Sequence, residues 1–317
     1  MDTSIFFQSL NWQSASPVDR IFVQFPNPER SPGEYCQCAI NSSRIELSVI
    51  IPTSDAYRDG YFCKLLRQIK NQNFSGFEII IVRGDPRQGR AINVAATLAK
   101  GKYILTLDDD TSLPDPETFR KLANVMDSYP EIGIAGGNNI VPSEAGIFVQ
   151  RVMKEIPRRS WRPVENITDS DFAEHPCMII RTEEFKAVGG ENELIPRGLD
   201  PYLREQFRKI GKRVVIVPGV FYSHMLPKNL SKLLRQFFRN GRNAAFTNLN
   251  YPQWVIETPS KHGSFNDRIP LPIRILRFIF RNIMAFITGK PFLLLSEFAY
   301  AMGFVYELSS KKYKVQE

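Results

Sequence analysis

The sequence is poor in cysteine: its 317 residues include only Cys36, Cys38, Cys63 and Cys177. Four cysteines are too few for a disulfide framework in a chain of this length, and the absence of a CxxC pair argues against a structural zinc site. Residues 1–10 also lack the basic start and the apolar run of a secretory signal peptide. These absences lead us to expect a protein of the reducing cytoplasm.

Internal repeats and low-complexity tracts are absent as well. Hydrophobic residues make up 43% of the chain and aromatic residues 12%, which is enough for a sizeable core and excludes a disordered or collagen-like protein. The chain is long for one domain and short for three. We therefore expect either one large α/β domain with appendages or two domains.

Charge is unevenly distributed along the chain. The net charge is +8, but residues 201–317 hold 19 basic and 6 acidic residues, whereas residues 1–200 hold 22 basic and 27 acidic ones. This asymmetry predicts a basic C-terminal surface that faces phosphates, anionic lipid or nucleic acid, with a merely solvated basic face as the alternative. Since no nucleic-acid-binding motif accompanies it, we expect no nucleic-acid partner.

Three short apolar runs alternate with helical patterns in the first part of the chain. The runs at 47–52, 77–82 and 103–107 have the composition of buried strands, and helical spacing occurs at 61–72 and 91–100. Such an alternation indicates a parallel sheet, because each crossover helix covers a face of the sheet. The predicted fold class is therefore α/β.

Shorter elements follow this unit. The polar, weakly patterned stretch at 150–170 suggests a loop, and residues 1–45 suggest an extended arm or a small cap. The other expected elements are helices at 116–128, 200–210 and 230–242 and strands at 132–136, 177–181 and 213–217.

Two nearly continuous apolar runs, 271–288 and 291–308, close the chain. Neither is the uncharged span of about 20 residues that a transmembrane helix needs. Arg274, Arg277 and Arg281 share one helical face of the first run. We expect both runs to be amphipathic helices at an anionic membrane surface, with completion of the core as the alternative. Further basic residues would add to the attraction: Lys311, Lys312 and Lys314.

Three adjacent acids, Asp108, Asp109 and Asp110, directly follow the third predicted strand. Ligands of open α/β sheets bind beyond the carboxyl ends of the strands. Neighbouring carboxylates repel one another without a cation, and their hard oxygen atoms suit Mg²⁺ or Mn²⁺, which would bridge to substrate phosphates. The alternative is an acidic loop whose aspartates cap a helix, but the position after a buried strand favours the metal site.

Six segments form an ordered set that is specific as a whole. They are LSVIIPT at 47–53, GRAIN at 89–93, GKYILTLDDD at 101–110, RTEEFKAVGG at 181–190, GLD at 198–200 and YSH at 222–224. Together they resemble the family 2 inverting glycosyltransferases, which have the GT-A fold, a Rossmann-like and mostly parallel sheet flanked by helices. The resemblance implies a catalytic domain at 46–245, with a nucleotide-sugar half at 46–140 and an acceptor half at 141–245, followed by the membrane-associated helices within 246–317.

The resemblance also implies roles for single residues. Asp110 would ligate a Mn²⁺ or Mg²⁺ ion, His224 would contact the metal or the diphosphate, and Asp200 falls on the position of the catalytic base. The implied donor is a UDP-, GDP- or dTDP-sugar. The residues that would bind it are Pro52, Thr53, Asp85, Arg90, Asn93, Asp108, Asp109, Gln236 and Arg239.

The sequence departs from the family pattern at three places. Asn240 replaces the tryptophan of a QxxRW motif that begins at Gln236, and together with the lack of several membrane spans this indicates a non-processive enzyme. Leu199 replaces the glutamate that usually precedes the catalytic aspartate, although a base needs only one carboxylate. Asp85 is the single acid where relatives often have adjacent acids for the nucleobase and ribose.

The predicted activity is metal-dependent, inverting sugar transfer to a lipid-linked or glycan acceptor at the cytoplasmic face of a membrane, in polysaccharide or glycolipid synthesis. Asp200 would take the proton of the acceptor hydroxyl, and the metal and Arg239 would stabilise the nucleoside diphosphate leaving group. A sugar nucleotidyltransferase is one alternative, but residues 52–57 lack the glycine-rich, lysine-bearing loop it requires. A non-catalytic basic module that binds membrane or nucleic acid would leave the clustered acids unexplained.

Overall fold

The computed structural model describes residues 34–39, 45–85, 87–142, 145–156, 162–225, 227–255, 262 and 270–310. The predictions for residues 1–33 and for Lys311, Lys312 and Lys314 fall outside these ranges.

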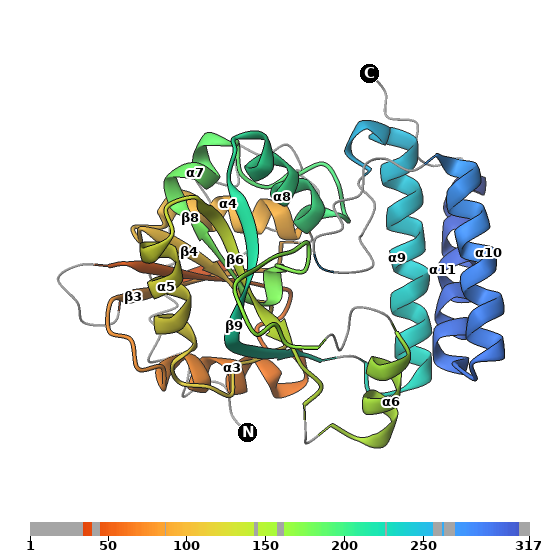
Figure 1. Cartoon of the computed structure of the whole chain (residues 1–317), viewed down its shortest axis with the longest axis horizontal. Helices are drawn as coiled ribbons and strands as arrows, with labels where there is room; N and C mark the ends of the chain where they lie inside the picture. Colours follow the sequence, from red (N-terminus) through yellow and green to blue (C-terminus); the bar gives the residue numbers. More distant parts are fainter. Residues whose placement is uncertain are drawn as a thin grey trace.

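Nine strands of the described residues form one sheet in the order β1-β3-β2-β4-β8-β6-β9-β5, with β7 beside β9 (Figure 1). The strands β2 (Leu47–Thr53), β3 (Phe77–Arg83) and β4 (Tyr103–Thr106) pair in parallel, which confirms the predicted unit of alternating strands and helices. At the edge, β1 (Glu34–Ala39) pairs antiparallel with β3, so part of the predicted arm is an edge strand.

The second half of the sheet is mixed. The strand β8 (Met178–Arg181) runs antiparallel between β4 and β6 (Ile132–Asn139), and the long strand β9 (Arg213–His224) runs parallel to β6. Two short strands, β5 (Thr111–Ser112) and β7 (Thr168–Asp169), pair antiparallel with β9. The β5 pairing matters most for function, because it carries the chain that follows β4 to the end of β9.

Helices cover both faces of the sheet (Figure 1). On one face lie α3 (Tyr61–Lys70) and α5 (Thr118–Ser128), whose apolar residues at helical spacing join one core cluster. On the other face lie α4 (Gln88–Leu98), α7 (Thr182–Ala187) and α8 (Leu199–Lys209), which contribute to a second cluster. The sheet residues alternate between the two clusters, as expected of strands buried on both faces.

A separate layer of helices stands beside this sandwich (Figure 1). It consists of α9 (Leu230–Asn250), α10 (Leu271–Ile287) and α11 (Pro291–Ser309), and the short turn η4 (Pro252–Trp254) follows α9. The two predicted C-terminal helices are thereby confirmed. The helix α9 extends beyond its predicted end at residue 242, and the boundary predicted at residue 245 lies inside it.

The prediction of a loop at 150–170 was wrong in its first part, because α6 (Ile147–Glu155) is helical. Its buried residues Val149, Val152 and Met153 pack in a small cluster with Leu233 of α9. The buried residues Val149, Val152, Met153 and Ile156 follow helical spacing, but the stretch predicted as a loop begins at residue 150 and so divides this pattern.

The helices α9 and α11 touch backbone to backbone at two glycines. A Cβ atom on Gly241 would lie 1.9 Å from the carbonyl oxygen of Tyr300, and one on Gly303 would lie 2.0 Å from the carbonyl oxygen of Phe238. A side chain at either position would force the helices apart. Arg242 on α9 adds an ion pair with the buried Glu307 of α11, at 2.7 Å.

We predict that Gly241→Ala lowers the free energy of unfolding by roughly 1–3 kcal/mol, the usual cost of overpacking. Gly146→Ala is the matched control, since nothing lies within 4 Å of a Cβ there and φ is −60°. Chemical denaturation of both variants measures the difference. Equal stability of the two variants would contradict the close approach of α9 and α11.

Candidate active site

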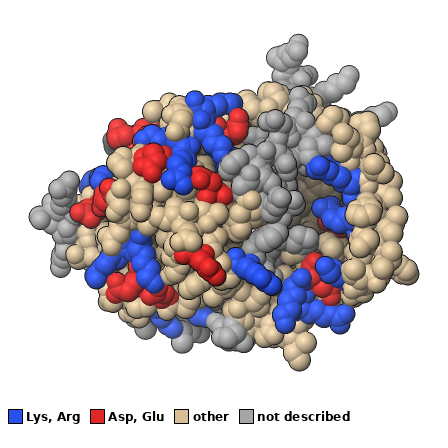
Figure 2. Space-filling view, in the orientation of Figure 1, with Lys and Arg blue, Asp and Glu red and all other residues tan. Residues whose placement is uncertain are grey.

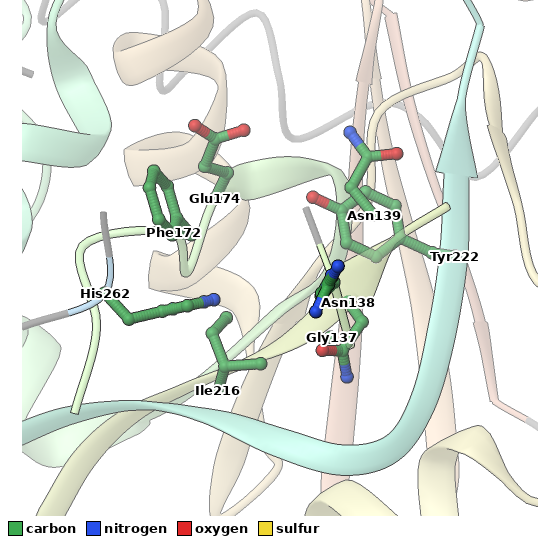
Figure 3. A pocket seen from close by; sticks show the side chains of 9 residues that line it. Gly137, Asn138, Asn139, Phe172, Glu174, Ile216, Tyr222 and His262 are labelled. Carbon is green, nitrogen blue, oxygen red and sulfur yellow. The ribbon is translucent and has the colours of Figure 1, made fainter. Parts of the chain in front are cut away.

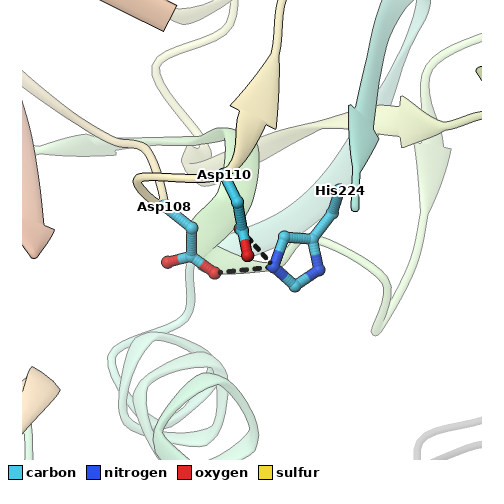
Figure 4. A group of neighbouring side chains, drawn as sticks. All are labelled: Asp108, Asp110 and His224. Atoms are coloured by element: carbon cyan, nitrogen blue, oxygen red, sulfur yellow. Dashed lines mark ion pairs between the residues drawn. The ribbon is translucent and has the colours of Figure 1, made fainter. Parts of the chain in front are cut away.

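The three adjacent acids occupy the turn between β4 and β5, at the carboxyl end of β4. A backbone hydrogen bond from the N–H of Thr111 to the carbonyl oxygen of Asp108 closes this turn at 3.0 Å. Thr111 then pairs with His224 at the end of β9. The turn and the pairing together point Asp108 and Asp110 toward the His224 ring (Figure 4).

Asp108, Asp110 and His224 form a compact set of metal-ligating atoms. The His224 Nε2 atom lies 2.8 Å from Asp110 Oδ1 and 3.4 Å from Asp108 Oδ2. One ligand atom of each of the three residues lies within 4.8 Å of the others. Two carboxylates and an imidazole on rigid elements are a donor set that suits a divalent cation such as Mn²⁺.

The surroundings separate the pKa values of the two acids. Burial raises the pKa of Asp108 to about 6, although His224 opposes the change. Burial also acts on Asp110, but His224 and Arg58 outweigh it and hold the pKa of that carboxyl well below its usual value. At neutral pH the cluster is therefore anionic and already attracts cations.

Arg58 is one such cation, and the sequence analysis missed it. It begins the 3₁₀ turn η2 (Arg58–Gly60), and its Nη2 atom lies 2.9 Å from Asp110 Oδ2, while its Nε atom lies 3.4 Å from Asp109 Oδ1. Its φ of +46° is in the left-handed region, which costs about 1 kcal/mol or more for a residue with a Cβ. No sequence signal distinguishes Arg58 from other surface arginines.

The other predicted contacts at this edge have separate partners. Thr53 Oγ1 donates a hydrogen bond to Asp109 Oδ2 at 2.6 Å, so Asp109 turns toward β2 and away from His224. Pro52, the residue before, is half-buried at the end of β2. Gln88 Nε2 donates to Asp108 Oδ1 at 2.8 Å. Asp109 is therefore held apart from Asp108 and Asp110, which both face His224.

Asp85 and Arg90 were both predicted as donor contacts, and here they bind one another. Arg90 donates from Nε to Asp85 Oδ2 at 2.7 Å and from Nη2 to Asp85 Oδ1 at 2.9 Å. Asn93, one turn further along α4, binds the segment after α7 through the backbone of Glu191. These three residues fix the loop after β3 and join the two halves of the domain.

Asp200 lies in the first turn of α8, which Gly198 precedes with a φ of +90°. Its Oδ1 atom accepts a hydrogen bond from the backbone N–H of His175 at 2.8 Å. His175 belongs to the 3₁₀ turn η3 (His175–Cys177), and its ring is buried beside Glu191. No sequence pattern singles out His175 or Glu191.

The last two predicted donor contacts, Gln236 and Arg239, lie on α9. In the part of the chain that the structure describes, no hydrogen bond or ion pair joins either side chain to the acids at the sheet edge. Arg239 is exposed and Gln236 is half-buried. Their role in donor binding stays a prediction.

A small cavity lies beside Glu174 and Asn139 (Figure 3). Its volume is about 20 Å³, far below the roughly 300–1,000 Å³ of typical ligand pockets. It is lined also by Phe172, Tyr222 and His262. The acidic cluster, and not this cavity, is therefore the candidate site.

Residues 83–188 match the model of Glycosyl transferase family 2. This match covers about a third of the chain, so the segment resembles a family 2 glycosyltransferase domain. The matched segment includes the three adjacent aspartates and η3, and it ends before Asp200 and His224. A comparison with curated protein sequences gives no match.

Several solved structures are similar to this chain. The mannosyltransferase PcManGT from Pyrobaculum calidifontis is 13% identical, with a TM-score of 0.52 over 98% of this chain and 97% of that one. TarS of S. aureus is 17% identical, with a TM-score of 0.45 over 65% of this chain and 40% of that one. GalNAc-T7 is 11% identical, with a TM-score of 0.45 over 71% of this chain and 53% of that one. The similarity to PcManGT extends over nearly the whole of both chains and supports the predicted GT-A fold.

Proposed function

We propose that this glycosyltransferase moves a sugar from a nucleotide-sugar donor to an acceptor hydroxyl with inversion, and that it needs Mn²⁺ or Mg²⁺. The observation that carries the proposal is the cluster of Asp108, Asp110 and His224 at the carboxyl edge of the sheet. Asp200 lies near enough to influence the charge state of Asp108. A cation site and a candidate base therefore share one edge.

Asp108, Asp110 and His224 would hold the metal ion. When bound, the ion supplies positive charge that stabilises the diphosphate leaving group. The exposed part of the Arg58 guanidinium, beside Asp110, is placed to bind the same diphosphate. We propose a UDP-, GDP- or dTDP-sugar as the donor, and PcManGT, which shares the fold, is in complex with GDP-Man and Mn²⁺.

Asp200 is the proposed base. Its side chain is 29% exposed, so an acceptor hydroxyl can reach it, and the His175 N–H holds its Oδ1 atom. Removal of the hydroxyl proton by Asp200 makes the acceptor oxygen a better nucleophile at the anomeric carbon. Attack on the side opposite to the leaving diphosphate inverts that carbon in a single displacement.

The C-terminal layer supports an acceptor at a membrane, but through a different face than expected. We predicted that the arginines of α10 face anionic lipid. Instead Arg274 donates to Asn248 of α9 at 3.0 Å, and Arg281 forms an ion pair with Glu297 of α11. The arginine face of α10 therefore includes contacts with its neighbouring helices.

The outward face of α10 is apolar. Exposed large apolar residues on it are Ile273, Ile275, Leu276, Ile279, Phe280, Ile283, Met284, Phe286 and Ile287. The corresponding edge of the molecule carries few charges (Figure 2). An apolar surface of this extent is typical of a membrane or partner contact. The helix α11 is, in addition, long and apolar enough to cross a membrane by length and composition alone.

We therefore propose that this apolar face enters the interfacial region of the membrane, on its cytoplasmic side. The acceptor would then be a lipid-linked or membrane-proximal glycan, and the synthesis non-processive. The basic residues of the layer would add attraction to anionic lipid.

We predict that Asp110→Asn weakens Mn²⁺ binding by at least roughly 10–100-fold, because that loss is typical even of the outer-shell partners of metal ligands and Asp110 is a proposed ligand itself. Asp109→Asn is the matched control, because Asp109 faces Thr53 and Arg58 and not His224. Isothermal titration with Mn²⁺ measures both. Equal binding by the two variants would show that the ion does not bind in this cluster.

For the base, Asp200→Asn should lower kcat by roughly 10²–10⁴ while the donor KM changes little. Asp169→Asn, at an exposed position of β7 paired with Arg213, should leave kcat unchanged. Steady-state transfer assays with a hydroxyl acceptor measure both. Turnover of Asp200→Asn within a few-fold of the parent would exclude Asp200 as the base.

The membrane contact is tested by Leu276→Glu combined with Phe280→Glu. These residues are 67% and 64% exposed, so the fold should persist while binding to vesicles is lost. Tyr129→Glu with Ile210→Glu makes the same charge change on the catalytic domain, and should leave binding intact. Co-sedimentation with neutral and with anionic vesicles is the measurement. Undiminished binding of the first variant to both would refute insertion through α10.

A further inference from the structure

A buried pair of ionisable residues lies behind Asp200. His175 comes from η3 and Glu191 from the segment after α7, and their exposed fractions are 2% and 3%. The His175 Nε2 atom lies 3.1 Å from Glu191 Oε1 and 3.8 Å from Asp200 Oδ1. The proposed chemistry does not use either residue, yet burying an acid and an imidazole is costly without a compensating role.

The hydrogen-bond network assigns the protons of the His175 ring. The Thr106 hydroxyl donates to the carbonyl oxygen of Met178 at 3.3 Å, so its oxygen is left to accept from His175 Nδ1 at 3.2 Å. Because Nδ1 carries a proton, a neutral ring would present a bare Nε2 to the Glu191 carboxylate, and two acceptors would face each other. One proton must therefore lie between Nε2 and Oε1.

The surrounding charges decide where this proton resides. Asp200 on α8, Glu191 and Asp108 after β4 all face the ring. Against the effect of burial, Asp200 and Glu191 raise the pKa of His175 to about 9. Burial also raises the pKa of Glu191, which His175 and Arg204 oppose. The raised pKa of His175 places the shared proton on its ring at neutral pH.

We propose that Glu191 and His175 form a positioning pair for Asp200. Glu191 keeps His175 an imidazolium, and that ring, together with the N–H of the same residue, holds Asp200 in place as a carboxylate. The inference rests on the proposed function, because it presumes that Asp200 is the base. Neither member of the pair needs to touch the acceptor.

Hydrogen bonds from α4 also hold the backbone of Glu191 in place. Asn93 Oδ1 accepts from the Glu191 N–H at 2.8 Å, and Asn93 Nδ2 donates to the Glu191 carbonyl oxygen at 2.9 Å. A Cβ on the preceding Gly190, whose φ is +70°, would lie 2.5 Å from Asn93 Oδ1. The Glu191 backbone is therefore locked to α4, and its side chain has little freedom to leave His175.

The variant that tests the pair is Glu191→Gln. A glutamine amide can donate to a neutral His175 Nε2, so the shape and the hydrogen bond persist while the imidazolium is lost. We expect kcat to fall about 10–100-fold, the effect of a misplaced catalytic group, with the donor KM nearly unchanged. The acidic limb of the kcat–pH profile should move to higher pH, because Asp200 no longer faces a cation.

Glu193→Gln is the matched control. Glu193 also accepts a hydrogen bond from Asn93, at 2.8 Å, but no ion pair joins it to His175 in the described structure. It should keep the parental kcat and pH profile. His175→Gln should lose as much kcat as Glu191→Gln, and the double variant should be no worse than either. His175→Gln also tests the pair if Glu191→Gln fails to fold.

A second measurement does not depend on activity. The chain has only three histidines, so NMR of the imidazole rings resolves them, and His175→Gln identifies the signal. His175 should be an imidazolium at pH 7 in the parent and neutral in Glu191→Gln. A neutral ring in the parent, or a kcat of both single variants within twofold of the parent, would overturn the proposal.

Asp200→Asn, assayed in parallel, distinguishes the proposed base from the proposed positioning pair. Loss of turnover in that variant with full turnover in Glu191→Gln and His175→Gln would refute the positioning pair alone. Full turnover in Asp200→Asn would refute the proposed base, and with it the positioning role.

Discussion

Repulsion between carboxylates is the constraint that shapes this site. Asp108, Asp109, Asp110, Asp200 and Glu191 converge at one edge of the sheet, largely buried. The chain places basic side chains among these acids: the Arg58 guanidinium, the His224 ring and the His175 ring. Arg58 and His224 both contact Asp110, and His175 lies between Glu191 and Asp200, so basic side chains oppose the repulsion on both sides of the cluster.

The topology explains how these charges meet. The strand β8 enters the sheet antiparallel to β4, and the chain that precedes it, η3, therefore lies at the carboxyl end of β4. The pairing of β5 with β9 brings His224 to the same place from more than a hundred residues away. The site thus depends on one reversed strand and one two-residue strand, which bring η3 and His224 to the acids after β4.

This topology also determines which strands and which site residues could be predicted from the sequence. The parallel strands were predictable because burial on both faces makes them continuous apolar runs, and the three aspartates because they follow such a run. The positions of three other residues at the site could not be predicted: Arg58, His175 and Glu191. Each contacts partners that are distant in the sequence, and none belongs to a recognisable sequence motif. The contact between Asp85 and Arg90 could not be predicted either. Their residue types predict polar contacts, but not that the two side chains bind one another.

In the C-terminal layer, the sequence predicted the helices but not which face of α10 packs against the protein. Periodicity placed the arginines on one face of α10, but an amphipathic pattern does not say which face meets the protein. Glu297 is buried on α11, and an acid in that position is unfavourable unless a cation reaches it. Arg281 satisfies this need, and by doing so it turns that face of α10 toward α11 and the apolar face outward. The orientation of the proposed membrane surface therefore follows from the need of one buried carboxylate for a partner.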